Sequence, residues 1–248
     1  MSFGVDIAAR IRENAAEAVA AYNRRPETKT AFEEPLIAYT PAANPIFEGL
    51  RQDGLCDHPK NIFLPARTII VYFIPYGKAV EDAQAAAGRP SAAWITAHRE
   101  AGLLTALING AIRRSLDSIG RITSGTNIPS DWQQDVFRPE WDHRVAAWLA
   151  GLGEIGPNGS FRTERGSAGK LGSCLCDGDL DVEMAAAPQD YQAFLEYFRK
   201  ANETPLPGTD CPAGAVDENG FDHAKCQEYC RTIYDYAPSP ELCGKCYR

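Results

Sequence analysis

The chain has 248 residues, of which 44% are hydrophobic and 23% charged, with a formal net charge of −8 at pH 7. These values fit one large or two small globular domains with a full apolar core. The acidic balance and the lack of a basic run argue against a sequence-independent grip on nucleic-acid phosphates, and they leave room for a tRNA held by a local patch.

The N-terminal residues carry charges from Asp6 onward and lack the apolar segment of a secretory signal. No apolar run in the sequence reaches the ~18 residues of a membrane span. We therefore expect a cytoplasmic protein that has no membrane partner. Disulfides are rare in the cytosol, so its eight cysteines are expected to bind metal, to act in catalysis or to fill the core.

Hydrophobic periodicity predicts the elements of the first half of the chain. An amphipathic helix is expected over residues 5–23, followed by an irregular, proline-rich stretch over 33–50. The run RTIIVYFIPY at 67–76 indicates a buried central strand. A long helix is expected over 91–119, capped by Ser91 and ended by a glycine. Its predicted apolar stripe comprises Leu103, Leu104, Leu107, Ile108, Ile112 and Leu116.

The second half alternates turns with shorter elements. Residues 121–142 are expected to form a surface loop, because glycine and prolines interrupt them. A helix over 143–151 leads into a glycine-rich turn at 151–159. A short strand with a following turn is predicted over 168–180, and a further helix over 188–201.

A domain boundary is expected near residue 203, between a core of residues 1–203 and a cysteine-rich segment of residues 204–248. The segment holds a Cys-Pro step, a lone cysteine and a C-x-x-C pair, the pattern of half a two-cluster ferredoxin. A [4Fe–4S] cluster needs four thiolates. The predicted metal ligands are Cys211, Cys226, Cys243 and Cys246.

The spacing of the cysteines alone favours a zinc site as much as an iron–sulfur cluster. Its four ligands would form two short-spaced pairs, as in a zinc ribbon. The remaining cysteines lie in or beside strand-like segments, where most cysteines act as small core hydrophobes. The zinc set is Cys226, Cys230, Cys243 and Cys246, and the core set is Cys56, Cys174 and Cys176.

The glycine-rich turn has two interpretations. It follows a helix, whereas a dinucleotide-binding fingerprint follows a strand and opens a helix, so a Rossmann NAD site is not indicated. Residue statistics favour a helix C-cap followed by a tight turn. The functional interpretation is a close approach of the backbone to a flat cofactor or its phosphate tail.

Several segments occur in the order found in one enzyme family. They are AAWLAGLGEIGPNGSF at 146–161, GSAGKLGSCLCDGDL at 166–180, DCPAGAVDENGFDHAKC at 210–226 and CGKC at 243–246. Over roughly residues 50–248 the chain resembles epoxyqueuosine reductases and the related reductive dehalogenases. The resemblance implies an α/β (α+β) nitroreductase-like core that binds cobalamin, with a short C-terminal ferredoxin-like iron–sulfur segment.

The resemblance also assigns the cysteines. The same four predicted cluster ligands match those of the family's cluster nearer the corrinoid, while the stretch KANETPLPGTD at 200–210 has no counterpart of the second cluster's ligands. It therefore implies one [4Fe–4S] cluster, favours iron over zinc and leaves Cys230 as a spectator. The implied partners are an electron donor such as ferredoxin or flavodoxin and a small organic or nucleoside substrate.

The remaining site residues follow from the same resemblance. The family's proton-donating aspartate has no counterpart in AWITAHRE at 93–100, where His98 and Glu100 are the alternative general acids, unless they only form a solvated helix face. Two other functions stay open: a non-catalytic electron-transfer or corrinoid-handling protein, and a zinc-stabilised binding domain. The predicted cofactor-binding residues are Gly151, Gly153, Gly156, Asn158, Leu171 and Cys176.

Overall fold

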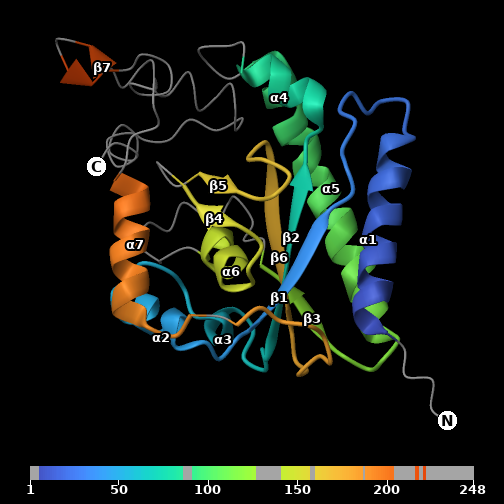
Figure 1. Cartoon of the computed structure of the whole chain (residues 1–248). Helices are drawn as coiled ribbons and strands as arrows, with labels where there is room; N and C mark the ends of the chain where they lie inside the picture. Colours follow the sequence, from blue (N-terminus) through green and yellow to red (C-terminus); the bar gives the residue numbers. More distant parts are fainter. Residues whose placement is uncertain are drawn as a thin grey trace.

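A sheet lies between two layers of helices in the computed structural model of the chain (Figure 1). The structure describes residues 6–85, 91–126, 141–156, 160–186, 188–203, 216–217 and 220–221. Within these residues the main sheet has four strands, and each neighbouring pair is antiparallel. Their order across the sheet is β1 (Leu36–Pro41), β2 (Thr68–Pro75), β6 (Gly169–Cys176) and β3 (Thr123–Gly125).

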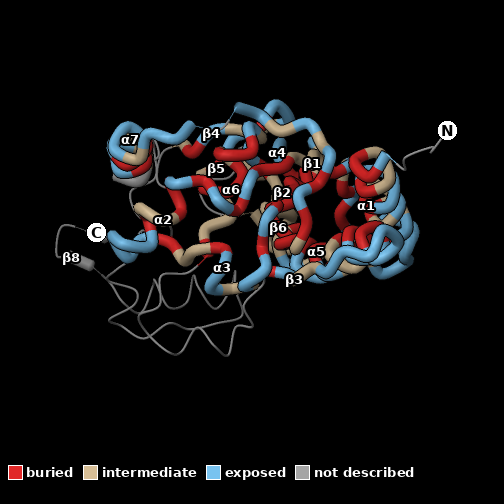
Figure 2. Tube along the Cα trace, turned by 90° about the horizontal axis from the view of Figure 1, so that it is seen from below, coloured by how far each residue is buried: buried red, intermediate tan, exposed pale blue. Residues whose placement is uncertain are grey.

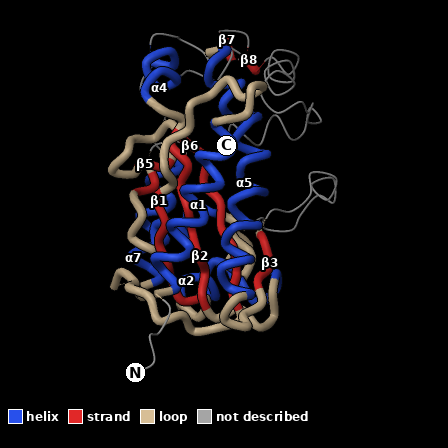
Figure 3. The backbone as a smooth tube through the Cα atoms, turned by 90° about the vertical axis from the view of Figure 1, so that its right-hand side faces the viewer, coloured by secondary structure: helices blue, strands red, loops and turns tan. Residues whose placement is uncertain are grey.

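Helices cover both faces of this sheet. The first layer consists of α1 (Ile7–Asn23) and α5 (Ala92–Asp117), which cross in front of the strands in Figure 3. The second layer consists of α2 (Pro45–Gln52), α6 (His143–Leu149) and α7 (Tyr191–Glu203). Figure 2 shows buried segments on the inner side of both layers, so the sheet separates two apolar clusters. The predicted mixed α/β class is confirmed, and the nitroreductase-like core and the ferredoxin-like segment stay predictions.

The remaining elements are short. The turn after α2 leads to α3 (Pro59–Ile62), and α4 (Lys78–Ala85) follows β2. The glycine-rich turn continues into a small hairpin of β4 (Glu154–Ile155) and β5 (Phe161–Arg162). A second small hairpin pairs the strands β7 (Val216–Asp217) and β8 (Gly220–Phe221).

The buried strand predicted at 67–76 is confirmed as β2, which is buried along its whole length. Successive side chains of a strand point to opposite faces. Ile70 and Tyr72 therefore pack with the α1 and α5 layer, and Ile69 and Val71 pack with the opposite layer. Because both faces are covered, the strand is buried throughout and mostly apolar instead of alternating.

The long helix predicted at 91–119 is confirmed as α5. The side chain of Ser91 accepts a hydrogen bond from the backbone N–H of Trp94 at 3.1 Å, as an N-cap does. The helix is followed by Gly120 with φ of 71°. Leu103 was wrongly assigned to the apolar stripe: it is 65% exposed, because the buried face follows four-residue steps through its neighbour Leu104.

One loop prediction is wrong, and a second is wrong at three residues. The stretch 33–50 contains β1 and most of α2, because its prolines stand where regular structure accepts them. Pro41 ends a strand at the edge of the sheet, and Pro45 opens α2 behind the N-cap Asn44. The stretch 121–142 includes β3, and residues 127–140 lie outside the described part.

The other predicted elements fall close to their expected bounds, with α1, α6, β6 and α7 confirmed. The domain boundary near 203 stays a prediction, since most of the following residues are not described. Among the helices that the structure describes, none has the length and apolar character that a membrane crossing requires.

Candidate functional site

Polar side chains gather along the part of β6 that β3 leaves uncovered. Within the described residues, β3 pairs with Cys174–Cys176 of β6, so Gly169–Ser173 has β2 on one side and no described strand on the other. We call this stretch, with the side chains around it, the β6 edge. The side chains are Tyr72, Tyr76, His98, Asn109, Thr126, Trp141, His143, Lys170, Ser173 and Cys174.

Ser173 is the centre of the polar contacts on the α6 side of the sheet. Trp141 donates its indole N–H to the Ser173 hydroxyl oxygen at 3.0 Å, and Nδ1 of His143 lies 3.1 Å from the same oxygen. The hydroxyl of Thr126 lies 2.8 Å from it and donates to the Ser173 carbonyl at 3.0 Å. Ser173 is fully buried, so each of these contacts replaces a hydrogen bond to water.

Counting protons in this cluster fixes the tautomer of His143. The Thr126 hydroxyl donates its proton to the Ser173 carbonyl. In the contact between the two hydroxyls, Ser173 must therefore be the donor and Thr126 the acceptor. All four contacts are then hydrogen bonds only if Nδ1 of His143 carries a proton and donates it to Ser173. The other ring nitrogen, Nε2, is left with a lone pair and no partner among the described residues.

His143 is neutral at pH 7. Burial is the main cause that lowers its pKa to about 4; the Asp142 carboxylate opposes this shift, and the Lys170 ammonium adds to it. The Asp142 carboxylate itself accepts from the guanidinium of Arg144 at 2.6 Å and from the Arg144 backbone N–H at 2.8 Å. It is thus committed to capping α6.

A second set of polar contacts lies on the α5 side of β6. The Tyr72 hydroxyl donates to Oδ1 of Asn109 at 2.6 Å, and the thiol of Cys174 donates to the same oxygen at 3.1 Å. The Tyr72 ring lies over Gly172, where a Cβ atom would come within 2.3 Å of it. Glycine at this position therefore lets the tyrosine reach Asn109. The amide nitrogen of Asn109 makes no hydrogen bond within the described part of the chain.

The structure separates the two predicted general acids. His98 faces the sheet, with Nδ1 3.2 Å from the Tyr76 hydroxyl, and burial lowers its pKa to about 4. The carboxylate of Glu100 accepts the backbone N–H groups of Lys29 and Thr30, both at 2.9 Å, on another side of the helix. His98 belongs to the β6 edge, whereas Glu100 holds the segment between α1 and β1.

The predicted cofactor glycines have contacts within the chain. Gly151 follows the C-cap of α6 with φ of 69°, which supports the C-cap interpretation of the turn. A Cβ atom on Gly153 would lie 2.1 Å from the carbonyl oxygen of Arg162, and one on Gly156 would lie 2.7 Å from the hydroxyl of Ser160. Packing of the β4–β5 hairpin thus accounts for these glycines, and their contact with a cofactor stays a prediction.

The other predicted cofactor residues divide between the two faces of β6. Leu171 is partly buried against the α6 layer, and Cys176 is buried on the α5 side, opposite Thr68 and Thr123 in the neighbouring strands. Asn158 lies outside the described residues.

The described cysteines are buried, unpaired thiols. Burial raises the pKa of Cys56 and of Cys174 to about 12, and it raises the pKa of Cys176. Protonated thiols are poor metal ligands, so these residues serve the core. The described residues contain no group of three or more side chains that could hold a metal ion. The predicted metal ligands and their neighbour lie outside the described part: Cys211, Cys226, Cys230, Cys243 and Cys246.

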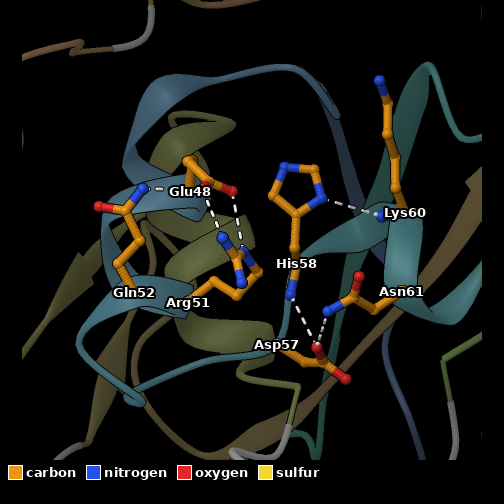
Figure 4. A network of polar contacts seen from close by, with 7 residues as sticks. All are labelled: Glu48, Arg51, Gln52, Asp57, His58, Lys60 and Asn61. Carbon is orange, nitrogen blue, oxygen red and sulfur yellow. Dashed lines mark hydrogen bonds and ion pairs between the residues drawn. The ribbon is translucent and has the colours of Figure 1, made fainter.

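Around α2 and α3, a network of surface side chains makes its hydrogen bonds and ion pairs with other members of the same network (Figure 4). Glu48 accepts both guanidinium hydrogen bonds of Arg51, at 2.6 and 2.9 Å, and these contacts lower the pKa of Glu48 to about 2. Nδ1 of His58 accepts the backbone N–H of Lys60 at 3.1 Å and so caps α3. We assign this network to the structure of the turn.

Comparisons with known proteins give structural neighbours alone: no protein-family model and no curated protein matches the chain. The catabolic reductive dehalogenase NpRdhA, in complex with 3-bromo-4-hydroxybenzoic acid, is 20% identical with a TM-score of 0.47. The match covers 80% of this chain and 27% of that one. Epoxyqueuosine reductase from Streptococcus thermophilus is 16% identical with a TM-score of 0.47, covering 98% of this chain and 65% of that one.

An epoxyqueuosine reductase bound to a modified tRNA stem loop is also found, at 14% identity and a TM-score of 0.41, covering 94% of this chain and 60% of that one. The chain resembles both kinds of enzyme. The resemblance predicted from the motifs is therefore confirmed. The chain spans 27% of the dehalogenase and 65% of the Streptococcus enzyme, so it corresponds to a part of either.

The donor chemistry of the β6 edge fits a corrinoid better than the glycine turn does. At Gly153 the chain's own carbonyl fills the space that a ring would need. Along β6, by contrast, Lys170 and the amide of Asn109 have no hydrogen-bond partner among the described residues, and Nε2 of His143 offers an acceptor. Such groups can pair with the amide side chains of a corrinoid and with the phosphate of its nucleotide tail.

Sequence reasoning missed most of this site. Lys170 and Ser173 were seen only as part of a strand, and His143 and Trp141 only as the approach to a helix. A lysine and a serine inside an otherwise apolar buried strand were the available signal, because buried polar groups require partners.

Proposed function

We propose that this chain is an oxidoreductase resembling epoxyqueuosine reductase, in which one [4Fe–4S] cluster passes electrons to a corrinoid at the β6 edge. The substrate would be a small organic molecule or a nucleoside. The observation that supports this most directly is that two neutral histidines, one on each face, lie along β6 together with donors that have no partner among the described residues. This strand carries the family-like motif GKLGSCLC at 169–176. The cluster ligands would be Cys211, Cys226, Cys243 and Cys246.

When bound, the corrinoid would supply the one-electron chemistry of cobalt. The chain would bind and orient the ligands and hold the proton. Asn109 donates from its amide, and His143 accepts at Nε2, its tautomer held by Ser173. Asn109 acts from the α5 side of β6 and His143 from the α6 side, and the helices that cover each face limit the access of water.

His98 is the proposed proton donor. Its contact with Tyr76 orients the ring. The ordinary pKa of a histidine side chain lies near neutrality, which suits a general acid. With a pKa of about 4 it is uncharged at pH 7, so it needs a neighbouring negative charge before it can take up a proton. Glu100 is a weaker candidate because two backbone N–H groups already occupy its carboxylate.

The same low pKa favours a second candidate function, an electron-transfer or corrinoid-handling protein without catalysis. Such a protein would need the cofactor contacts of the β6 edge but no charged acid. The two functions differ in whether a bound substrate charges His98.

Metal analysis tests the proposal. Protein purified without oxygen should contain about four iron and four sulfide per chain, the content of one cubane. Cys211→Ser should lose the iron, and the matched variant Cys230→Ser should keep it. A zinc site predicts the reverse, with about one zinc retained in Cys211→Ser and lost in Cys230→Ser.

Titration with cob(II)alamin then tests the second cofactor. Protein with its full iron content should change the cobalamin spectrum in a saturable way. Iron-replete protein that leaves the spectrum unchanged would remove the corrinoid and favour the electron-transfer function. Protein that holds zinc in place of iron would remove both redox functions.

A further inference from the structure

Lys170 lies in an unusual position, on the α5 side of β6 and half-buried. Its register partner on β2 is Ile74, so Tyr72 and Tyr76 are its diagonal neighbours on the same face of the sheet. Within the described part of the chain, its ammonium makes no hydrogen bond and no ion pair. Burial lowers the pKa of Lys170, and no acidic group acts in the opposite direction.

The groups around this ammonium are neutral at pH 7. His98 contacts Tyr76, one diagonal neighbour, and Asn109 contacts Tyr72, the other. The positive charge of Lys170 lowers the pKa of His98 and also that of His143 on the far side of β6, so the ammonium lies near both imidazoles.

Three acidic groups of the neighbouring segments are committed elsewhere. Glu100 accepts backbone N–H groups from residues 29 and 30. Asp142 accepts from Arg144, and Glu33 accepts from Arg165 at 3.0 Å. None of these three carboxylates neutralises Lys170.

A cation that is partly removed from water without a partner costs free energy, which a bound anion would recover. We propose that Lys170 binds an anionic group, a phosphate or a carboxylate, of the ligand that occupies the β6 edge. The amide nitrogen of Asn109, on α5 beside Tyr72 and Cys174, is a neutral donor on the same face of the sheet for another polar group of that ligand. Lys170 thus selects ligands that carry a negative charge.

This inference deepens the proposed function and rests on it only for the identity of the ligand. An anion beside Lys170 would also favour the protonated form of His98. Binding of a negatively charged substrate would therefore favour protonation of His98, whereas His98 stays neutral in the empty site. Binding of a simple anion can be measured whether or not the chain carries a cluster.

Titration with inorganic phosphate and with acetate, followed by calorimetry at pH 7, tests the proposal. Wild-type protein should bind one of them in a saturable way, Lys170→Gln should bind it at least ten-fold more weakly, and Lys170→Arg should stay within about three-fold. The matched control is Lys60→Gln, an exposed lysine whose ammonium points away from the contacts drawn in Figure 4. Stronger binding of phosphate would indicate a phosphorylated ligand, and stronger binding of acetate a carboxylate.

Proton NMR of the imidazoles gives a second measurement on wild-type protein alone. The bound anion should raise the pKa of His98 and leave that of His58, in the α3 cap, unchanged. This readout remains if Lys170→Gln does not fold. Equal binding by wild type and Lys170→Gln, or no saturable binding and no shift of His98 in wild type, would overturn the proposal. Iron content, measured on the same samples, reports separately on the proposed function.

Discussion

The Ser173 hydroxyl oxygen lies 3.1 Å from Nδ1 of His143, and this contact joins the middle of β6 to the first residue of α6. The same oxygen accepts from Trp141 and contacts Thr126, which directly follows β3. One buried hydroxyl therefore ties together three separate segments of the chain. Removal of the Ser173 hydroxyl should therefore lower the stability of the protein as well as disturb the site.

Ser173→Ala is expected to lower the free energy of unfolding by about 2–4 kcal/mol, because buried partners on three residues lose hydrogen bonds at once. Urea unfolding followed by tryptophan fluorescence would measure this change. Ser167→Ala, at an exposed position, is the matched control and should stay within about 0.5 kcal/mol of wild type. Equal effects of the two substitutions would contradict the role of Ser173.

Stability should fall as the pH is lowered from 6.5 toward 4. His98 and His143 have native pKa values of about 4, below their unfolded value of 6.5. Above pH 6.5 the two histidines are neutral in both the native and the unfolded state. Below pH 6.5 they take up protons in the unfolded chain but not in the native state, so unfolding becomes more favourable. The effect is expected to reach roughly 1–3 kcal/mol for each histidine near pH 4.

Urea unfolding at pH 7, 6 and 5 would measure this dependence above the range in which most carboxylates titrate. The charged groups that face these rings are Lys170 for both and Asp142 for His143. His143→Asn, which retains a donor toward Ser173, should be about half as sensitive to pH. Stability that is flat between pH 7 and 5 would show that the two rings are not buried as the structure has them.

Two glycine substitutions should act in opposite directions. Gly153→Ala would place a methyl group against the carbonyl of Arg162, which belongs to the backbone and cannot move away, so we expect a loss of about 2–4 kcal/mol. Gly102→Ala lies in the exposed middle of α5 with nothing within 4 Å, and it should stabilise the protein by about 0.5–1 kcal/mol.

Thermal unfolding of both variants would check these signs. A Gly153→Ala protein as stable as wild type would indicate that the turn has room for more than its own chain, and would restore the glycine as a cofactor contact. Substitution at Gly153 therefore cannot test cofactor binding unless stability is measured alongside.

Glu100→Ala is expected to loosen the segment between α1 and β1. Hydrogen exchange at the amides of Lys29 and Thr30 should accelerate, because each loses a charged acceptor, and stability should fall by about 1–3 kcal/mol. Iron content and cobalamin binding should not change. His98→Ala should leave exchange at those two amides unaltered, and a reversed outcome would return Glu100 to the site.

The sequence predicted the long regular elements because their periodicity is local. β2 and α5 could be placed within about two residues of their bounds from apolar runs and a serine cap. The Ser173 cluster could not, since its members come from segments that only tertiary packing brings together. The separation of His98 from Glu100 was available in principle: two residues apart on a helix, they must point to different sides.

The pairing of β2 with β6 has a consequence for the way the chain folds. Thr68 lies opposite Cys176, and Pro75 opposite Gly169, so the two central strands are separated by roughly a hundred residues of chain. Closing so long a loop costs entropy before any strand contact repays it. During synthesis, β2 would leave the ribosome with both of its faces apolar and one of its two strand partners still to be made. The nascent chain thus has an interval in which an eight-residue, mostly apolar strand has not yet met its neighbour, and chaperone binding in that interval would protect it from aggregation.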